Sequence, residues 1–600
     1  MAPFRKLRLY TIFILLAFAG PSTGYAQYLL NKVVSVNVHE KPLAEVLKSV
    51  AMQGGFYFSY SGDVVPENRS VTLTAKSKTV KQVLDALLDS KYQYKERDNY
   101  IIIQDGEGYI VSGYVVDRNT GDKISYASVY ERQQLVSAIT NEQGYFKLKL
   151  KDKDKYPVAS IAVSKGMYTD TFMSLKPGFD QVLTVPIRPR DYEMDSIVVK
   201  PRVEKSWLAD IFLSSKQKLQ SANIGNFIAS RPVQTSFVPG LGSHGKLGAQ
   251  VVNKFSLNIL GGYTAGANGV EVGGLFNIDK GNVGFVQLAG LFNLVGGKVN
   301  GVQVAGLYNS ALNSLNGVQL SGLSALTTGS MTGAQVSGLY SHTAGKVVGM
   351  QLAGLFNFAG DETQGVQLAG LGNINAIKLH GMQLGGLYNY AGKISGAQVS
   401  GIGNIASKKI DGVQVAGVFN YAKELAGTQV ALVNIADSSS GCSIGLINIV
   451  LKNGVHKISL YTNEILNTNF AVKTGTKNFY SILTAGANIE KDKKAYGMAL
   501  GVGGETRIAK RFSLNTEATA GIVYLGDWRE TATLLRVVPA LHFKLSRYIS
   551  FYAGPALSLY YQNSTVHIEG YKAAIPGYDA YSFAKYGSAW IGWQGGIDIF

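Results

Sequence analysis

The chain has 600 residues, including 70 glycines, 34 tyrosines and 25 phenylalanines, and only 16% of its residues are charged. This length excludes a single core and predicts about three to five units of roughly 150 residues each. The lone cysteine, Cys442, excludes an internal disulfide and any multi-cysteine metal site. The net charge of +17 comes from scattered Lys and Arg, which favours ordinary solvation over nucleic-acid binding.

Residues 1–27 have the pattern of a cleaved secretory signal. Arg5, Lys6 and Arg8 precede an apolar run over residues 9–19, and small residues follow up to Ala26. The run is too short to cross a bilayer as a helix, which needs about 20 residues. We expect the mature chain to begin near Gln27 without an N-terminal lipid anchor. Because no later segment is long and apolar enough for a transmembrane helix, any membrane span must be a β-barrel.

Residues 28–105 twice repeat a strand followed by a helix. Val34, Val36 and Val38 alternate as in a strand, and the next segment has apolar residues at helical spacing. The second copy has a strand at 71–73, a helix at 80–87 and two closing strands. This order resembles the short N-terminal domain of secretins and TonB-dependent transducers. The resemblance implies a periplasmic domain that contacts a partner, often an inner-membrane regulatory protein; a compact spacer is the alternative.

Residues 109–189 change to short strands separated by turn sequences such as "NTGD" and "NEQG". The order of glycines, turns and alternating apolar residues resembles the carboxypeptidase regulatory-like β-sandwich. The resemblance implies an Ig-like, non-catalytic module, and we expect it to act as a rigid spacer. Residues 190–231 should form a helical linker around Trp207, Leu208, Ile211 and Phe212, and 232–268 should contain entry strands at 234–238 and 255–263.

Residues 269–450 contain about twelve copies of a short unit, such as "GVQVAGLYN" at 301–309. Its glutamine recurs every 15 or 16 residues from Gln287 to Gln429, and Glu271 takes the first glutamine position. A fixed period of this kind marks stacked units that cannot bury their apolar faces alone. The pattern resembles bacterial surface proteins built on GxQxxGLxN repeats, which implies an envelope location. The candidate ladder residues are Gln303, Asn309, Gln351, Asn357, Gln383, Asn389, Gln414 and Asn420.

Two architectures fit this repeat. In a β-solenoid each unit is one coil, identical side chains stack about 4.8 Å apart, and the array is a rod of roughly 55–60 Å. In the alternative each unit is one strand of a large barrel, and with two entry strands and eight final strands the total would be about 22. Antiparallel neighbours should repeat every two strands, whereas the sequence has one clean period. The β-solenoid is therefore favoured.

Residues 455–600 lose the repeat and contain about eight long alternating strands joined by short polar turns, which indicates outer-membrane β-barrel strands. Aromatic residues near strand ends are expected to form interfacial girdles, namely Tyr552, Tyr560, Tyr561, Trp590 and Trp593. The final strand ends at Phe600 and resembles the C-terminal signal of outer-membrane proteins. A soluble β-sandwich is the alternative.

Nothing in the sequence indicates catalysis. "GLGSHG" at 240–245 has GxGxxG spacing but opens no helix, and His39 lacks the second histidine of a zinc helix. We predict no catalytic, cofactor-binding or metal-binding residues and no cofactor. The predicted fold class is mainly β and multidomain: a small α+β domain, an Ig-like sandwich, a repeat array and C-terminal barrel strands.

The predicted function is that of a non-enzymatic protein of a Gram-negative outer membrane with a periplasmic docking or signalling head. Its expected partners are outer-membrane lipid, the barrel-assembly machinery and a periplasmic or inner-membrane regulatory protein that binds residues 28–105. The first alternative is an outer-membrane pore or transporter with the repeats as barrel strands, although residues 190–270 contain no plug-like segment. The second alternative is surface adhesion or a structural envelope role.

Overall fold

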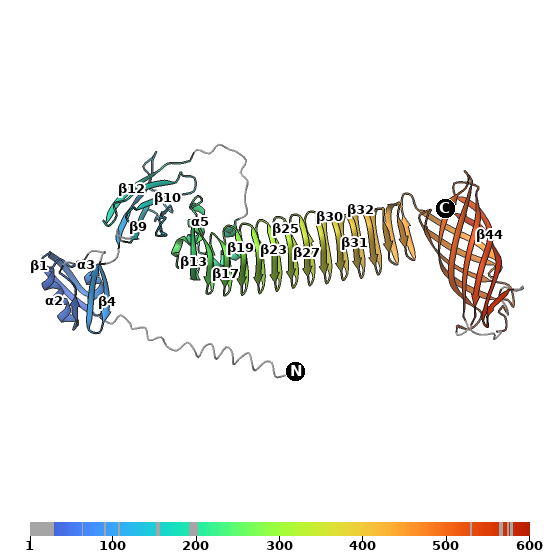
Figure 1. Ribbon diagram of the computed structural model, residues 1–600, viewed down its shortest axis with the longest axis horizontal. Helices are drawn as coiled ribbons and strands as arrows, with labels where there is room; N and C mark the ends of the chain where they lie inside the picture. The colour runs from blue at the N-terminus through green and yellow to red at the C-terminus, as the bar shows by residue number, and fades with distance from the viewer. Residues whose placement is uncertain are drawn as a thin grey trace, which may run out of the picture. The chain divides into compact units, whose positions relative to one another are not determined.

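The computed structural model describes residues 29–600 apart from 63, 89–91, 106–107, 152–155, 191–201, 529–530, 563–567, 573–574 and 576–579. The predicted signal at 1–27 lies outside the described residues. The chain divides into two compact units. The first comprises the two N-terminal domains with residues 215–227 and 245–247, and the second comprises 197–214, 228–244 and 248–600. Figure 1 shows the elements of both.

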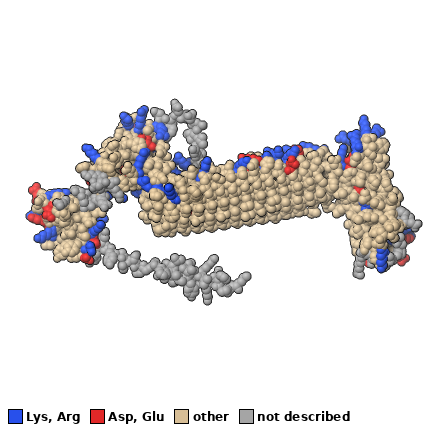
Figure 2. Space-filling view, in the orientation of Figure 1, with Lys and Arg blue, Asp and Glu red and all other residues tan. Residues whose placement is uncertain are grey.

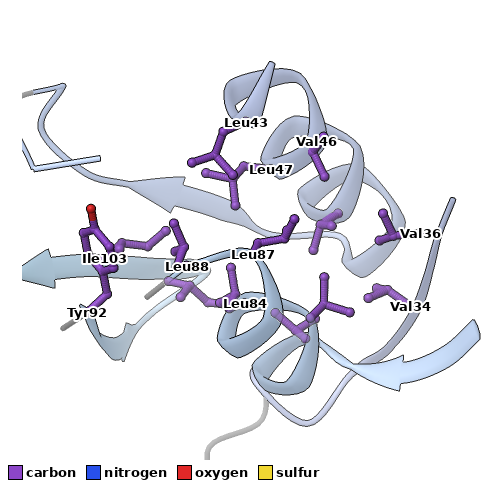
Figure 3. Close-up of a cluster of buried hydrophobic side chains, with 14 of the residues drawn as sticks. Val34, Val36, Leu43, Val46, Leu47, Leu84, Leu87, Leu88, Tyr92 and Ile103 are labelled. Carbon is purple, nitrogen blue, oxygen red and sulfur yellow. The ribbon is translucent and has the colours of Figure 1, made fainter. Parts of the chain in front are cut away.

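The first domain packs two helices against short strands. The elements are β1 (Val33–Pro42), α2 (Leu43–Gly54), β2 (Tyr57–Ser59), β3 (Ser70–Thr79), α3 (Val80–Leu87), β4 (Tyr92–Arg97) and β5 (Tyr100–Asp105). β1 pairs with β3, and β5 lies between β2 and β4. Leu43, Leu47, Leu84 and Leu87 converge in the core, because both helices turn their apolar faces toward each other (Figure 3). Thr79 and Gln82 form a capping box that starts α3.

The second domain is a sandwich of two small sheets. Its strands are β6 (Tyr109–Asp117), β7 (Ser128–Glu131), β8 (Val136–Ile139), β9 (Tyr145–Leu150), β10 (Ser160–Ser164), β11 (Thr171–Ser174) and β12 (Gln181–Ile187). The sheet orders are β11-β10-β7-β8 and β12-β6-β9. Helix α5 (Ser215–Asn223) belongs to the same compact unit. The Asn223 side-chain amide donates to the Tyr126 carbonyl at 2.8 Å, which fixes the helix end.

The repeat region is a series of stacked parallel coils, so the predicted β-solenoid of about twelve turns is confirmed. Its long strands begin with β15 (Val251–Asn258), β17 (Gly266–Gly273), β19 (Val283–Ala289), β21 (Val299–Ala305), β23 (Leu315–Ser321), β25 (Met331–Ser337), β27 (Val347–Ala353) and β29 (Thr363–Ala369). The short strands between them are β16 (Gly261–Thr264), β18 (Phe276–Asp279), β20 (Phe292–Val295), β22 (Tyr308–Ala311), β24 (Ser324–Thr327), β26 (Tyr340–Thr343) and β28 (Phe356–Ala359).

Later in the array a short strand and the next long strand are continuous. These elements are β30 (Gly372–Gly385), β31 (Tyr388–Ser400) and β32 (Gly403–Ala416), and they are followed by β33 (Phe419–Leu425), β34 (Thr428–Val430), β35 (Val433–Ser439), β36 (Cys442–Ile444) and β37 (Ile447–Val450). Each glutamine aligns with the glutamine of the next coil, as Gln303 does with Gln319. The pairing is parallel throughout the repeats, so these units are not antiparallel barrel strands.

The segment before the repeats differs in detail from the prediction. A 3₁₀ turn, η1 (Val203–Lys205), and helix α4 (Trp207–Phe212) lie in the predicted helical linker, and β13 (Ala229–Val238) begins before the linker was expected to end. β14 (Leu241–Gly242) and a 3₁₀ turn, η2 (Gly245–Gln250), follow. The expected strand 255–263 is divided into β15 and β16, because the first coil already turns between them. Phe212 of α4 packs on Phe276 and Phe292 of the first coils.

The C-terminal segment is a closed, barrel-like antiparallel sheet. Its strands are β38 (Val455–Asn463), β39 (Thr468–Gly475), β40 (Tyr480–Asn488), β41 (Ala495–Arg507), β42 (Phe512–Tyr524), β43 (Ala532–Lys544), β44 (Ile549–Tyr561), β45 (Tyr581–Ala584) and β46 (Gly587–Ile599). The ring closes because β46 pairs with both β44 and β38, while β45 pairs only along the edge of β46. Within the described residues, no helix is long and apolar enough to cross a membrane.

Candidate functional site

A continuous glutamine ladder runs through the interior of the solenoid. Every ladder glutamine from Gln287 to Gln429 is fully buried. From Gln303 onward, the side-chain Nε2 of each glutamine donates to the Oε1 of the glutamine one coil earlier, at 2.7–2.9 Å. The predicted residues Gln303, Gln351, Gln383 and Gln414 all belong to this ladder. The ladder pairs polar groups that would otherwise be buried without partners.

A second ladder is formed by the asparagines and runs in the opposite direction. Asn293 Nδ2 donates to Oδ1 of Asn309, one coil later, at 2.9 Å. Equivalent bonds, each directed to the next coil, connect Asn357, Asn373, Asn389, Asn404 and Asn420 in series. Each Nδ2 also reaches a backbone carbonyl of the next coil, such as Leu320 O from Asn309. Because the glutamine amides donate backward and the asparagine amides forward, the side-chain dipoles of the two ladders oppose each other.

The asparagine ladder is interrupted in the middle of the array. Ala325 and Ser341 occupy the two asparagine positions between Asn309 and Asn357. The Oδ1 atom of Asn357 therefore lacks a donor from the preceding coil and is buried without a hydrogen-bond partner. Thr327 and Thr343 supply hydroxyls to the glutamine ladder in the same coils, so the interior there is held by a different set of polar contacts.

Two buried carboxyl groups end the glutamine ladder at the first coil. Gln287 Nε2 donates to Glu271 Oε2 at 2.8 Å and also to Asp279, and Asn258 donates to Glu271 Oε1 at 3.0 Å. The first position of the ladder needs a hydrogen-bond acceptor, because every glutamine donates toward the N-terminal end of the array. An ionised carboxylate, which only accepts, meets this need. Glu271 and Asp279 are both fully buried. Burial, and then the charge of Glu271, raise the pKa of Asp279 well above its ordinary value.

Replacing Asp279 should change the pH dependence of stability. Folded Asp279 retains its proton above pH about 4, where the unfolded side chain loses it, so the folded state binds more protons and its stability falls as pH rises toward the raised pKa. Asp279→Asn carries no such proton. We expect the free energy of unfolding of Asp279→Asn, relative to that of the native protein, to increase between pH 5 and pH 8 by about 1–3 kcal/mol.

The measurement is thermal and urea unfolding of the full chain across this pH range. The control is Asp361→Asn, an exposed aspartate of the same array. Parallel pH profiles for the native protein and Asp279→Asn would contradict a protonated carboxyl at position 279.

The barrel interior contains a buried group of ionisable side chains. Lys473 Nζ lies 2.6 Å from Glu517 Oε1 and 3.5 Å from Asp598 Oδ1, and Lys457 Nζ lies 2.9 Å from Glu505 Oε2. A second pair joins Arg536 and Glu464 at 3.1 Å. All but Glu505 are at least 95% buried. These residues were missed at the sequence level, although Lys457 and Lys473 each fall in the inward phase of an alternating strand.

The outer surface of the barrel is apolar instead. Its outward positions carry large exposed hydrophobic side chains, among them Ile458, Leu460, Phe470, Leu483, Met498, Leu500, Leu535, Val537, Leu541, Phe551, Leu557, Leu559, Ile591 and Trp593. Their exposed fractions lie between 40% (Leu483) and 74% (Ile591). Charges inside and hydrophobic groups outside reverse the arrangement of a water-soluble protein. A soluble sandwich would bury these hydrophobic side chains and expose the ionisable ones.

The aromatic residues expected near strand ends divide into two groups. Tyr561 and Trp593 are about half exposed and point outward. Tyr552, Tyr560 and Trp590 are buried inside the barrel, so the expected girdle position is wrong for these three. The difference follows from the alternation of side chains along each strand, which turns these three residues inward. Trp590 Nε1, for example, donates to the interior Glu464 at 3.0 Å. Phe600 lies next to β46, and its N–H donates to the Tyr548 carbonyl at 3.0 Å.

The histidine of the "GLGSHG" segment has an ordinary structural contact. His244 Nδ1 lies 3.0 Å from Gln234 Oε1, and burial lowers its pKa. No group of three or more His, Cys, Asp or Glu in the described part of the chain is arranged to hold a metal ion.

Comparison with known proteins identifies one domain. Residues 111–199 match the family model of the CarboxypepD_reg-like domain, which agrees with the sandwich of β6 to β12. No curated protein matches the chain.

Proposed function

We propose that this chain is a non-enzymatic outer-membrane protein in which the C-terminal barrel is the anchor and the N-terminal domains form a periplasmic docking head. The observation that carries the proposal is the reversed polarity of the barrel. An outward apolar band with an ionisable interior suits hydrocarbon outside the strands. Pairing of β38 with β46 joins the first and last long strands of the ring, as a strand structure surrounded by lipid requires.

The lengths of the connections support the orientation. Residues 476–479, 508–511 and 545–548 are turns of four residues at the barrel end where β38 begins and β46 ends. The connections at the opposite end are 464–467, 489–494, 525–531 and the long segment 562–586, so three of these four are longer than four residues. Short periplasmic turns and longer outer loops are the rule for bacterial outer-membrane barrels. The solenoid directly precedes β38 in the chain and so joins the barrel at the short-turn end. We therefore propose a periplasmic location for the solenoid and for the domains that precede it, which disfavours surface adhesion.

The barrel interior favours an anchor over a pore. The cavity between Lys473, Glu517 and Arg536 measures about 50 Å³, which holds only a few water molecules. The parallel coils of the array add no strands to the barrel wall. The predicted wide pore required those strands, so we do not propose transport.

The docking role rests on the first domain and its surface. Tyr57 and Tyr100 form an exposed aromatic pair with ring centroids 5.5 Å apart, on the neighbouring strands β2 and β5. Exposed aromatic residues are enriched where proteins bind partners. We propose that a periplasmic or inner-membrane regulatory protein binds residues 28–105 and that the sandwich is a spacer.

One substitution pair tests the anchor. Leu500 lies mid-strand on the outer face of β41, and Ile508 lies in the short turn that follows β41; both are more than half exposed. In a bilayer, Leu500→Arg should lower the free energy of unfolding by about 2–4 kcal/mol, and Ile508→Arg by about 0–1 kcal/mol. The measurement is urea unfolding of the full chain in phospholipid vesicles. The folded fraction is read from the difference in gel mobility between heated and unheated samples. Equal small effects of the two substitutions would contradict a lipid-facing barrel surface.

A further inference from the structure

The charged residues of the solenoid are confined to one edge. Between residues 272 and 450 the sequence has thirteen Lys, Asp and Glu residues besides the buried Asp279, and every one lies three to seven positions before a ladder glutamine or its equivalent. These residues, the charged edge, are Lys280, Lys298, Lys346, Asp361, Glu362, Lys378, Lys393, Lys408, Lys409, Asp411, Lys423, Glu424 and Asp437. Figure 2 shows the charges of the array along one edge, with the remainder of the visible face uncharged.

The opposite turn of most coils carries an exposed aliphatic side chain, and Leu291 and Leu371 are half-buried at this position. These residues, the leucine edge, are Leu275, Leu307, Leu323, Leu339, Leu355, Leu387, Ile402, Val418, Leu432 and Leu446. Their exposed fractions lie between 37% (Leu355) and 56% (Leu432), and successive coils are about 4.8 Å apart. A row of ten exposed apolar side chains along one edge is the kind of contiguous patch that marks an interaction surface.

The backbone of the leucine edge is already paired within the stack. Leu339 N–H and Tyr340 N–H both donate to the Leu323 carbonyl, at 2.9 and 3.1 Å, and the same pattern recurs from coil to coil. Turns usually leave such groups to water, and lipid cannot hydrogen-bond them. The N–H groups of these turns can therefore leave water without losing a hydrogen bond.

We propose that the solenoid lies along one leaflet of a bilayer, with the leucine edge inserted toward the acyl chains and the charged edge at the headgroups. No charged side chain lies between position 330, in the row of the charged edge, and Leu339. The surface that would face the acyl chains is therefore uncharged. The charged edge has eight lysines against five acidic residues, which suits anionic headgroups.

The position of the solenoid in the chain is consistent with contact between the solenoid and the bilayer. Only residues 451–454 separate the last coil from the first barrel strand. The inference rests on the proposed anchor, because a barrel in the membrane would place the end of the array at the bilayer surface. The predicted leaflet is the one on the short-turn side of the barrel.

Three single-cysteine variants test the inference in the full chain, each carrying Cys442→Ser and an environment-sensitive fluorophore. Leu339→Cys places the probe on the leucine edge, Ser330→Cys places it at an exposed position of the charged row in the same coil, and Leu500→Cys places it on the barrel surface. The proteins are reconstituted in vesicles of phosphatidylethanolamine and phosphatidylglycerol with doxyl-labelled acyl chains. We expect the probe at 339 to be blue-shifted and quenched to an extent similar to the probe at 500, and the probe at 330 to be quenched little.

The outcomes separate the inference from the proposed anchor. Quenching at 500 but not at 339, with a water-like spectrum at 339, would overturn leaflet insertion and leave the anchor standing. A blue shift at 339 without lipid quenching, together with disulfide-linked dimers of unlabelled Leu339→Cys, would overturn it in favour of packing between two copies. Quenching at neither 339 nor 500 would overturn both proposals.

Discussion

Gly365→Ala should destabilise the solenoid strongly, by about 3 kcal/mol or more. Gly365 has φ +141°, a conformation that L residues rarely adopt, and a Cβ atom there would lie 1.9 Å from the Gly349 carbonyl oxygen. The glycine two positions before the glutamine recurs in consecutive coils with φ between +123° and +150°. Because each coil is stabilised by its neighbours, opening one coil weakens two interfaces.

The control for this substitution lies in the same array. Gly284 has no atom closer than 3.8 Å to the position of an added Cβ, so Gly284→Ala should change the free energy of unfolding by less than about 0.5 kcal/mol. In that coil Phe285 takes the glycine position and has φ +69°. The measurement is urea unfolding of the full chain with hydrogen exchange of peptides from 340–390. Similar losses for both variants would show that the close approach of the coils does not limit stability.

The periodicity of the sequence favoured the solenoid but left barrel strands open as the alternative. Equivalent residues recur at one spacing, and only parallel coils place Gln303, Gln319 and Gln335 in contact with one another. The same spacing explains the burial of the glutamines and asparagines, since each gains its partner from an identical residue in the next coil. The α+β domain and the sandwich followed from alternating apolar residues and turn sequences, which are local signals.

Features that depend on contacts between different strands were not predictable in this way. The directions of the two ladders depend on side-chain rotamers, and the pairing of Glu271 with Asp279 depends on which positions face inward in the first coil. In the barrel, aromatic content indicated girdles, but the phase of β44 and β46 turned Tyr552 and Trp590 inward. The buried Lys473, Glu517 and Asp598 come from three separate strands, so no local pattern connects them.

Gln367→Glu tests whether the glutamine ladder requires amides. Gln367 donates to Gln351 and accepts from Gln383, both at 2.7 Å. An ionised glutamate can accept but cannot donate, so the Gln351 oxygen would face a buried carboxylate without a hydrogen bond between them. We expect a loss of about 3–5 kcal/mol at pH 8.

The pH dependence of this loss distinguishes the ladder from simple packing. The introduced carboxyl group regains a donor when it is protonated, and burial should raise its pKa, so the destabilisation should shrink as pH falls from 8 toward 5. Asn316→Asp is the control, since it makes the same change from amide to carboxylate at an exposed position of another coil, in β23. Its effect should stay within about 0.5 kcal/mol and should not follow this trend. If Gln367→Glu is as mild as Asn316→Asp at pH 8, the coils are held by backbone pairing and apolar packing, and the amide ladder contributes little to their stability.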